Sequence, residues 1–162
     1  MTIVDFGPIK EGSGNIFQSG WIDEPAKFGE RVRKPYGILS LAYDGGFANS
    51  NVSDLRDDAV FLLRYRIDDG PTGVVPPKVL VGILSFLAGW INRGVSLHIH
   101  CVAGKSRSTY FHAGLRMLML QESADEAIAF ISERKPDILN QPGAFQQCFV
   151  ESLHEFEKEL AK

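Results

Sequence analysis

Short apolar runs alternate with helical spacings along most of the chain. Residues 37–43, 59–67 and 95–100 are apolar runs of strand length that end in glycine or aspartate, or lead into a glycine-containing stretch, which is typical of buried strands. Residues 15–20 form a shorter run, which we predict as an edge strand. Residues 1–14 are rich in glycine and lack periodicity, so we predict an irregular lead-in.

Helical patterns follow these strands in the second half of the chain. Pro76 and Pro77 open a helix with apolar positions three or four residues apart, ending near Arg93 and Gly94. A second helix is predicted from about residue 107 to 121. A third starts at the capping box of Ser123 and stops at residues 135–136. A terminal helix carries an apolar face, formed by Phe145, Phe149, Leu153, Phe156 and Leu160.

The intervening segments have weaker signals. Residues 23–33 resemble a short helix opened by Glu24-Pro25, and residues 47–58 are polar and loop-like. Residues 68–73 form a loop dense in aspartate, glycine and proline. Strands that alternate with helices predict a single α/β domain over residues 1–162. We expect a central, mostly parallel, twisted sheet of about four to five strands flanked by helices.

Charge and hydropathy exclude several classes of partner. Seventeen basic and 20 acidic residues give a net charge of −3, so no overall basic field predicts a nucleic-acid partner. The longest apolar stretch, residues 79–91, is too short to span a bilayer, and the first ten residues lack the apolar segment of a secretory signal. We therefore expect no membrane span, a cytoplasmic location and a monomer.

The chain has two cysteines, Cys101 and Cys148, which argues against a disulfide framework and favours a reducing compartment. His98, His100 and Cys101 could be imagined as metal ligands, but strand alternation puts His100 and Cys101 on opposite faces. We therefore predict no metal and no cofactor. Cys148 lies on or beside the apolar face of the terminal helix, where we expect packing; a redox partnership with Cys101 is the alternative.

Residues 100–108, with the sequence HCVAGKSRS, connect a predicted strand to a predicted helix. In such a strand–loop–helix arrangement, successive backbone N–H groups converge on an anion. A cysteine at the loop entrance, Cys101, would have its sulfur at the base, where the helix dipole and the amides favour a thiolate. Arg107 could hold two phosphate oxygens with its guanidinium, and Gly104 suits a backbone that must bend at positive φ. The loop residues predicted to bind phosphate are Val102, Ala103, Gly104, Lys105, Ser106 and Arg107.

Other side chains would complete such a site. Ser108 could donate a hydrogen bond to the thiolate, and His100 could fix the loop from behind; an ordinary helix-start hydroxyl and a packed histidine are the alternatives. The leaving oxygen of a phosphate ester needs a proton, and Asp68 and Asp69 lie in an exposed loop after a strand. From composition alone, turn-forming aspartates explain that pair equally well.

Residues 100–108 resemble the phosphate loop of the cysteine-based protein tyrosine phosphatases, in particular their small, atypical dual-specificity branch. Asp69 precedes Cys101 by the family's usual acid-to-nucleophile spacing, and residues 67–71 are similar to the acid loop of the regenerating-liver phosphatases, where the second aspartate is the acid. The resemblance extends over residues 36–160. It implies a phosphotyrosine protein phosphatase-like fold and a catalytic set of Cys101, Arg107, Asp69 and Ser108. It also implies that Asn140 hydrogen-bonds the loop, whereas the bare sequence predicts a helix cap there.

The activity implied is hydrolysis of phosphotyrosine and phosphoserine or phosphothreonine in proteins through a cysteinyl-phosphate intermediate. Phosphoinositides, inositol phosphates or an RNA 5′-phosphate are alternative substrates for the same chemistry. Lys105 favours the lipid alternative, but Val102 occupies the position of the second basic residue that such enzymes often carry. A phospho-binding module without catalysis and rhodanese-type sulfur transfer are alternatives of other classes.

Overall fold

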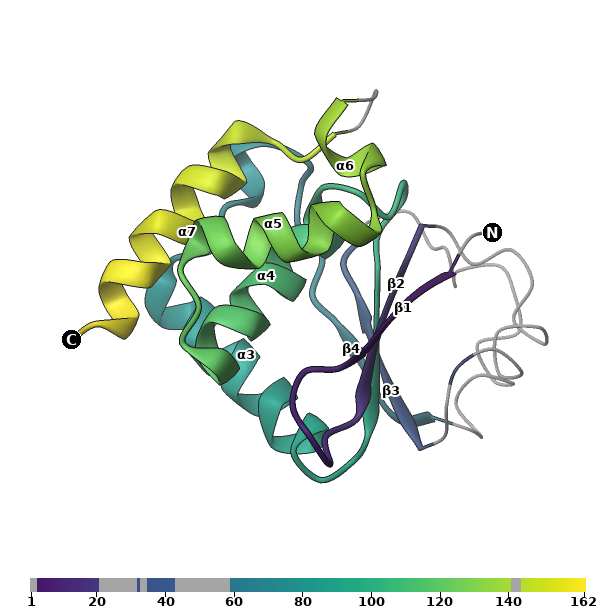
Figure 1. The fold of residues 1–162 in the computed structure, drawn as a ribbon. Coiled ribbons are helices and arrows are strands. Elements are labelled where there is room, and N and C mark those ends of the chain that lie inside the picture. Colours follow the sequence, from purple (N-terminus) through teal and green to yellow (C-terminus); the bar gives the residue numbers. More distant parts are fainter. Residues whose placement is uncertain (1–2, 21–31, 33–34, 43–58, 141–143) are drawn as a thin grey trace.

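The protein is described by a computed structural model, which covers residues 3–20, 32, 35–42, 59–140 and 144–162. The predicted helix over residues 23–33 and the predicted loop over residues 47–58 lie almost entirely outside these ranges. Five strands form one sheet in the order β1-β2-β5-β3-β4, with helices packed against it (Figure 1). The strands are β1 (Ile3–Pro8), β2 (Asn15–Ser19), β3 (Tyr36–Ser40), β4 (Ala59–Arg64) and β5 (Ser96–His100).

The sheet is mostly parallel, as the sequence predicts. β2 and β3 both pair with β5 in parallel, β4 pairs with β3 in parallel, and only the β1–β2 pair among the described strands is antiparallel. Two predictions at the N-terminus are wrong. The lead-in contains β1, and β1 rather than β2 is the edge strand, so residues 15–19 lie inside the sheet. β1 escaped detection because its side chains are mostly half-exposed and give no apolar run.

The predicted helices are confirmed with small changes in their ends. The first of these helices starts at Pro77, a position at which the missing N–H of proline removes no intrahelical hydrogen bond. The third helix has the predicted capping box of Ser123 and Glu126. A four-residue helix, α6, was not predicted because its single turn shows no periodicity. The helices are α3 (Pro77–Ile91), α4 (Arg107–Leu120), α5 (Ala124–Arg134), α6 (Asp137–Asn140) and α7 (Gln147–Leu160), with a 3₁₀ turn, η1, at Pro71–Gly73.

Strand alternation divides the buried residues between the two faces of the sheet. Ile16 and Leu39 belong to the main core, which the strands share with α3, α4, α5 and α7. Their neighbours Phe17 and Ile38 belong to a second, smaller cluster with Tyr36. The described long helices lie on one face of the sheet (Figure 1). None of the helices in the described part of the chain has the length and hydrophobicity needed to cross a bilayer.

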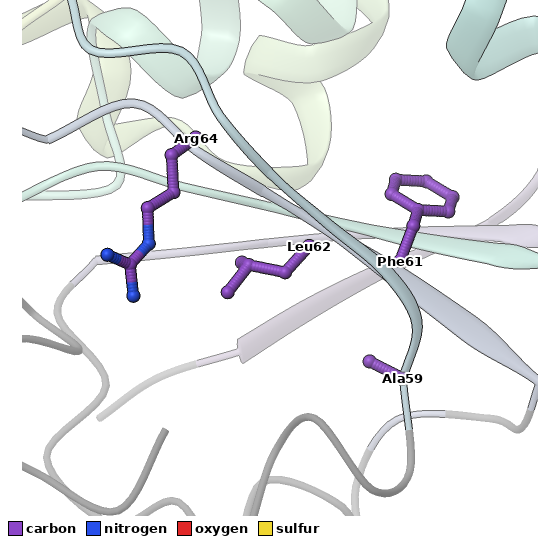
Figure 2. Close-up of a pocket in the computed structure, with 4 residues that line it drawn as sticks. All are labelled: Ala59, Phe61, Leu62 and Arg64. Carbon is purple, nitrogen blue, oxygen red and sulfur yellow. The ribbon is translucent and has the colours of Figure 1, made fainter. Parts of the chain in front are cut away.

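Edge strand β4 borders a hollow lined by Ala59, Phe61, Leu62 and Arg64 (Figure 2). The Phe61 ring, which points away from the other three side chains, packs against Phe86 and Trp90 of α3. None of these side chains carries a nucleophile, so the hollow is a feature of the sheet edge rather than of the predicted site.

Candidate active site

The carboxyl ends of the parallel strands define the edge of the sheet at which the predicted site lies. His100 ends β5, and Ser19 of β2 and Ser40 of β3 stand beside it in register. Residues 101–106 leave this edge as a loop, and α4 begins at Arg107. The strand–loop–helix arrangement predicted from the sequence is therefore confirmed. Ligands commonly bind at such an edge because loops and helix N-termini meet there.

Cys101 lies at the base of the loop and is almost completely buried. Its Sγ accepts a hydrogen bond from the backbone N–H of Gly104 at 3.2 Å and lies 3.5 Å from the Ser108 hydroxyl. Its own N–H donates to the carbonyl of Ser19 at 3.4 Å. The sulfur thus accepts one backbone hydrogen bond, has the Ser108 hydroxyl beside it, and lies before the positive N-terminal end of a 14-residue helix.

Gly104 is the residue that lets the loop curl around the sulfur. It adopts φ of +71°, and a Cβ at this position would lie 2.3 Å from the backbone nitrogen of Gly20. Both the left-handed backbone and the close approach to the end of β2 require glycine. The sequence prediction of a positive φ here is confirmed.

Arg107 is buried in the first turn of α4 and faces the loop that follows β4. Its Nη1 donates to the carbonyl of Ile67 at 3.2 Å, and its Nε lies 4.0 Å from Asp69 Oδ2. The two aspartates of this loop differ: Asp68 Oδ2 accepts a hydrogen bond from the Thr72 hydroxyl at 2.8 Å, within its own loop. Of these two aspartates, the structure thus brings Asp69, and not Asp68, to Arg107.

Two buried histidines support the strand that leads into the loop. His100 Nδ1 lies 3.4 Å from the Cys101 carbonyl, and His98 Nε2 lies 2.9 Å from the Ser19 hydroxyl. Burial is the main cause that lowers the pKa of His100 to about 4; the bond to the Cys101 carbonyl partly opposes it, and the charge of Arg107 adds to it. Burial and then the neighbouring His100 hold the pKa of His98 well below 6.5. Both rings are therefore neutral near pH 7, so His100 donates its Nδ1–H to Cys101.

The remaining predicted residues are placed as follows. Val102 and Ala103 are exposed on the loop, and Ser106 is buried, with a hydroxyl that has no hydrogen-bond partner among the described residues. Asn140 is the last residue of α6, and its side chain lies outside the described part of the structure. Cys148, a free thiol on α7, is partly buried, and burial raises its pKa.

The sequence analysis gave no role at the site to three polar residues around the loop, namely Gln18, Lys135 and Asp137. Lys105 of the loop lies 3.6 Å from Asp137 of α6, which also binds Lys135 at 2.9 Å. Gln18 of β2 contacts the loop from inside the core. An amide in the middle of the buried run NIFQS was the one available signal for Gln18. In the described part of the chain no three His, Cys, Asp or Glu side chains come together as metal ligands.

Comparison with solved structures assigns the fold. The structure of PTPMT1 in complex with PI(5)P superposes with a TM-score of 0.75 at 20% identity, covering 95% of each chain. The active form of Tk-PTP gives a TM-score of 0.70 at 21% identity over 94% of this chain and 95% of that chain. The human tyrosine phosphatase-like serine/threonine/tyrosine-interacting protein gives 0.75 at 19% identity over 98% of both.

These neighbours belong to the atypical dual-specificity phosphatases and their relatives in the cysteine-based protein tyrosine phosphatase superfamily, and this chain has their fold. The expected α/β fold of the phosphotyrosine protein phosphatase type is thereby confirmed. A scan against models of protein families gives no match, and neither does a search of curated proteins.

Proposed function

We propose that this protein is a phosphatase that hydrolyses phosphate monoesters through a cysteinyl-phosphate intermediate on Cys101. The observation that carries the proposal is the Cys101 sulfur, which accepts a hydrogen bond from Gly104 N–H and lies beside the Ser108 hydroxyl, in a loop that ends at buried Arg107. A nucleophile, donors for a phosphoryl group and an acid on a neighbouring loop are the groups that the reaction needs.

The reaction would proceed in two displacements. The Cys101 thiolate attacks phosphorus, the S–P bond forms, and the P–O ester bond breaks as Asp69 gives its proton to the leaving oxygen. Arg107 and the amides of residues 102–107 hold the oxygens of the transferring phosphoryl group. Asp69 then takes a proton from water, which attacks phosphorus and breaks the S–P bond to release inorganic phosphate. Ser108 stabilises the departing thiolate.

Phosphorylated protein side chains are the proposed substrates, and phosphoinositides are a second candidate supported by a specific observation. Lys105 and Lys135 flank Asp137 beside the loop, so two ammonium groups and one carboxylate border it. A further phosphate on the substrate would find a positive charge there. One neighbour in fold was solved with PI(5)P bound. The proposed location is a reducing compartment such as the cytoplasm, because the mechanism needs an unoxidised Cys101.

The chemistry is tested with an aryl phosphate and with vanadate, an oxyanion that mimics phosphate. Wild-type protein should turn over the aryl phosphate with a burst of product, and mass spectrometry of acid-quenched Asp69→Asn protein should find the phosphoryl group on Cys101. Cys101→Ser should abolish turnover and still bind inorganic phosphate. Turnover that survives Cys101→Ser would disprove the mechanism.

One neighbour in fold is named as phosphatase-like and interacting, which makes a non-catalytic phospho-binding module the rival of another class. Wild-type protein that binds phosphopeptides without any burst would establish that rival. Side-by-side rates on phosphopeptides and on phosphoinositide vesicles then decide the substrate, and Lys135→Ala should slow the vesicle reaction alone if the lipid candidate is right.

A further inference from the structure

Gln18 is a completely buried amide on β2, a strand that carries none of the proposed catalytic residues. Its Nε2 lies 2.9 Å from the Gly104 carbonyl and 2.9 Å from Thr109 Oγ1, and its Oε1 lies 3.2 Å from His112 Nδ1. Burying a primary amide is costly unless its donors and acceptor are satisfied. Gln18 meets that condition by joining β2, the phosphate loop and α4.

The donor and acceptor roles in this network are fixed. A carbonyl can only accept, so the nitrogen of the Gln18 amide must face Gly104. The oxygen then faces His112, which must donate from Nδ1; a neutral ring with its proton on Nδ1 is sufficient for this. Burial, with a smaller effect from Arg116, lowers the pKa of His112 to about 3, which agrees with a neutral ring.

The bond to Gly104 controls the peptide group that follows. In a trans peptide the C=O and N–H point in opposite directions, so fixing the Gly104 carbonyl toward Gln18 turns the Lys105 N–H to the other side. That other side faces away from the buried strand. Gly104 itself, at φ of +71°, sends its own N–H to the Cys101 sulfur. The conformation of Gly104 therefore sets the directions of two consecutive N–H groups, its own and that of Lys105, and Gln18 fixes the Gly104 carbonyl by a hydrogen bond.

The neighbouring residues of β2 reinforce this arrangement. Ser19 accepts the N–H of Cys101 with its carbonyl, and Gly20 lies so close to Gly104 that no side chain fits between them. The end of β2 thus packs directly against the backbone of the loop. Gln18 supplies the one side-chain hydrogen bond from this strand to the loop among the described residues.

We propose that Gln18 is a positioning residue, which orients the Gly104–Lys105 peptide so that the Lys105 N–H takes part in phosphoryl binding. This inference rests on the proposed function, because it assigns Gln18 a role in the same oxyanion site. Without Gln18, the Gly104 carbonyl would be buried without a donor, and the peptide would be free to turn that carbonyl toward the phosphate oxygens.

The test compares Gln18→Met, which keeps the side-chain volume and removes the donor, with Thr109→Val, which removes another bond of the same amide and leaves Gly104 bonded. Gln18→Met should raise the vanadate dissociation constant on the order of tenfold and lower kcat, whereas Thr109→Val should change the constant by less than about threefold. Equal effects in the two variants, after correction for the folded fraction, would reduce Gln18 to a structural residue.

A measurement on wild-type protein keeps the inference testable if Gln18→Met does not fold. Vanadate should shift the side-chain amide resonances of Gln18 together with the backbone amide of Lys105, since hydrogen bonds in a chain polarise one another. Unmoved Gln18 resonances on a protein that binds vanadate would overturn the inference. A wild-type protein that does not bind vanadate would instead overturn the proposed function.

Discussion

Asp68 and Asp69 are adjacent in sequence, and only their partners distinguish them. Asp69 reaches toward Arg107, whereas Asp68 is held by Thr72. From composition the two were equivalent, and the family resemblance alone favoured the second. The sequence places both residues in the loop after β4. Which of the two carboxylates lies near Arg107 depends on where α4 starts relative to that loop, and this is a matter of tertiary structure.

Asp69→Asn should therefore lower kcat for alkyl phosphates more than for aryl phosphates with good leaving groups, because only the former need a proton at the leaving oxygen. We expect a loss on the order of 10²-fold for the poor leaving groups. Rates across a series of leaving groups measure this. Asp68→Asn is the matched control and should leave the dependence on leaving group unchanged; the reverse pattern would assign the acid to Asp68.

Gly104 offers a second prediction for a single residue. Gly104→Ala should lower the free energy of unfolding by about 2 kcal/mol or more, through the left-handed backbone and the contact with Gly20. It should also weaken vanadate binding. Chemical denaturation and vanadate titration measure the two effects.

Gly89 in α3 is the control for Gly104, since a Cβ there would meet nothing within 4 Å. Gly89→Ala should stabilise the protein by about 0.5–1 kcal/mol through helix propensity, with vanadate binding unchanged. A Gly104→Ala protein as stable as wild type would show that the loop does not need the left-handed conformation.

Elements with strong local signals were predictable, and elements with weak ones were not. α5 was predicted from its capping box, in which Ser123 Oγ accepts the N–H of Glu126 and a carboxylate oxygen of Glu126 accepts the N–H of Ser123 at 2.8 Å. β1 is half-exposed and α6 is a single turn, so neither has a periodicity that a sequence pattern can reveal. The place of β2 inside the sheet depends on pairing with β1 and β5, which no local pattern specifies.

Ser123→Ala should cost about 1 kcal/mol of stability, because it leaves N–H groups in the first turn of α5 without acceptors. For a chain of this size that corresponds to a fall in Tm of roughly 2–4 °C, measurable by thermal denaturation. Ser132→Ala is the control, since the Ser132 hydroxyl bonds back to Ala129 within the same helix. A capping contribution is disproved if both variants melt at the wild-type temperature.

At the scale of the whole molecule, the parallel strands bring residues from distant parts of the sequence to one edge. Gln18, Cys101 and Asp69 come from three segments, and the latter two were predicted as site residues from the sequence because their side chains suit the proposed chemistry. Gln18 carries no chemical signature, so only the sheet order that places β2 beside β5 shows its contact with the loop. The same order buries three neutral histidines, His98, His100 and His112, around that edge.

These histidines should make global stability depend on pH. Their pKa values in the folded protein are lowered, to about 4 for His100 and about 3 for His112, so below pH 6.5 the unfolded chain binds more protons than the folded one. The free energy of unfolding should be at its full value above pH 6.5. It should fall as the pH drops toward 4, by up to about 1.4 kcal/mol per pH unit for each histidine.

His112→Gln separates this effect from the titration of carboxylates, which both proteins share. Urea denaturation between pH 7 and pH 4.5 should give a shallower loss of stability for His112→Gln than for wild type, by the contribution of one proton. If His112→Gln loses stability with falling pH as steeply as wild type, the His112 ring takes up its proton in the folded state as well, and its burial does not contribute to the pH dependence.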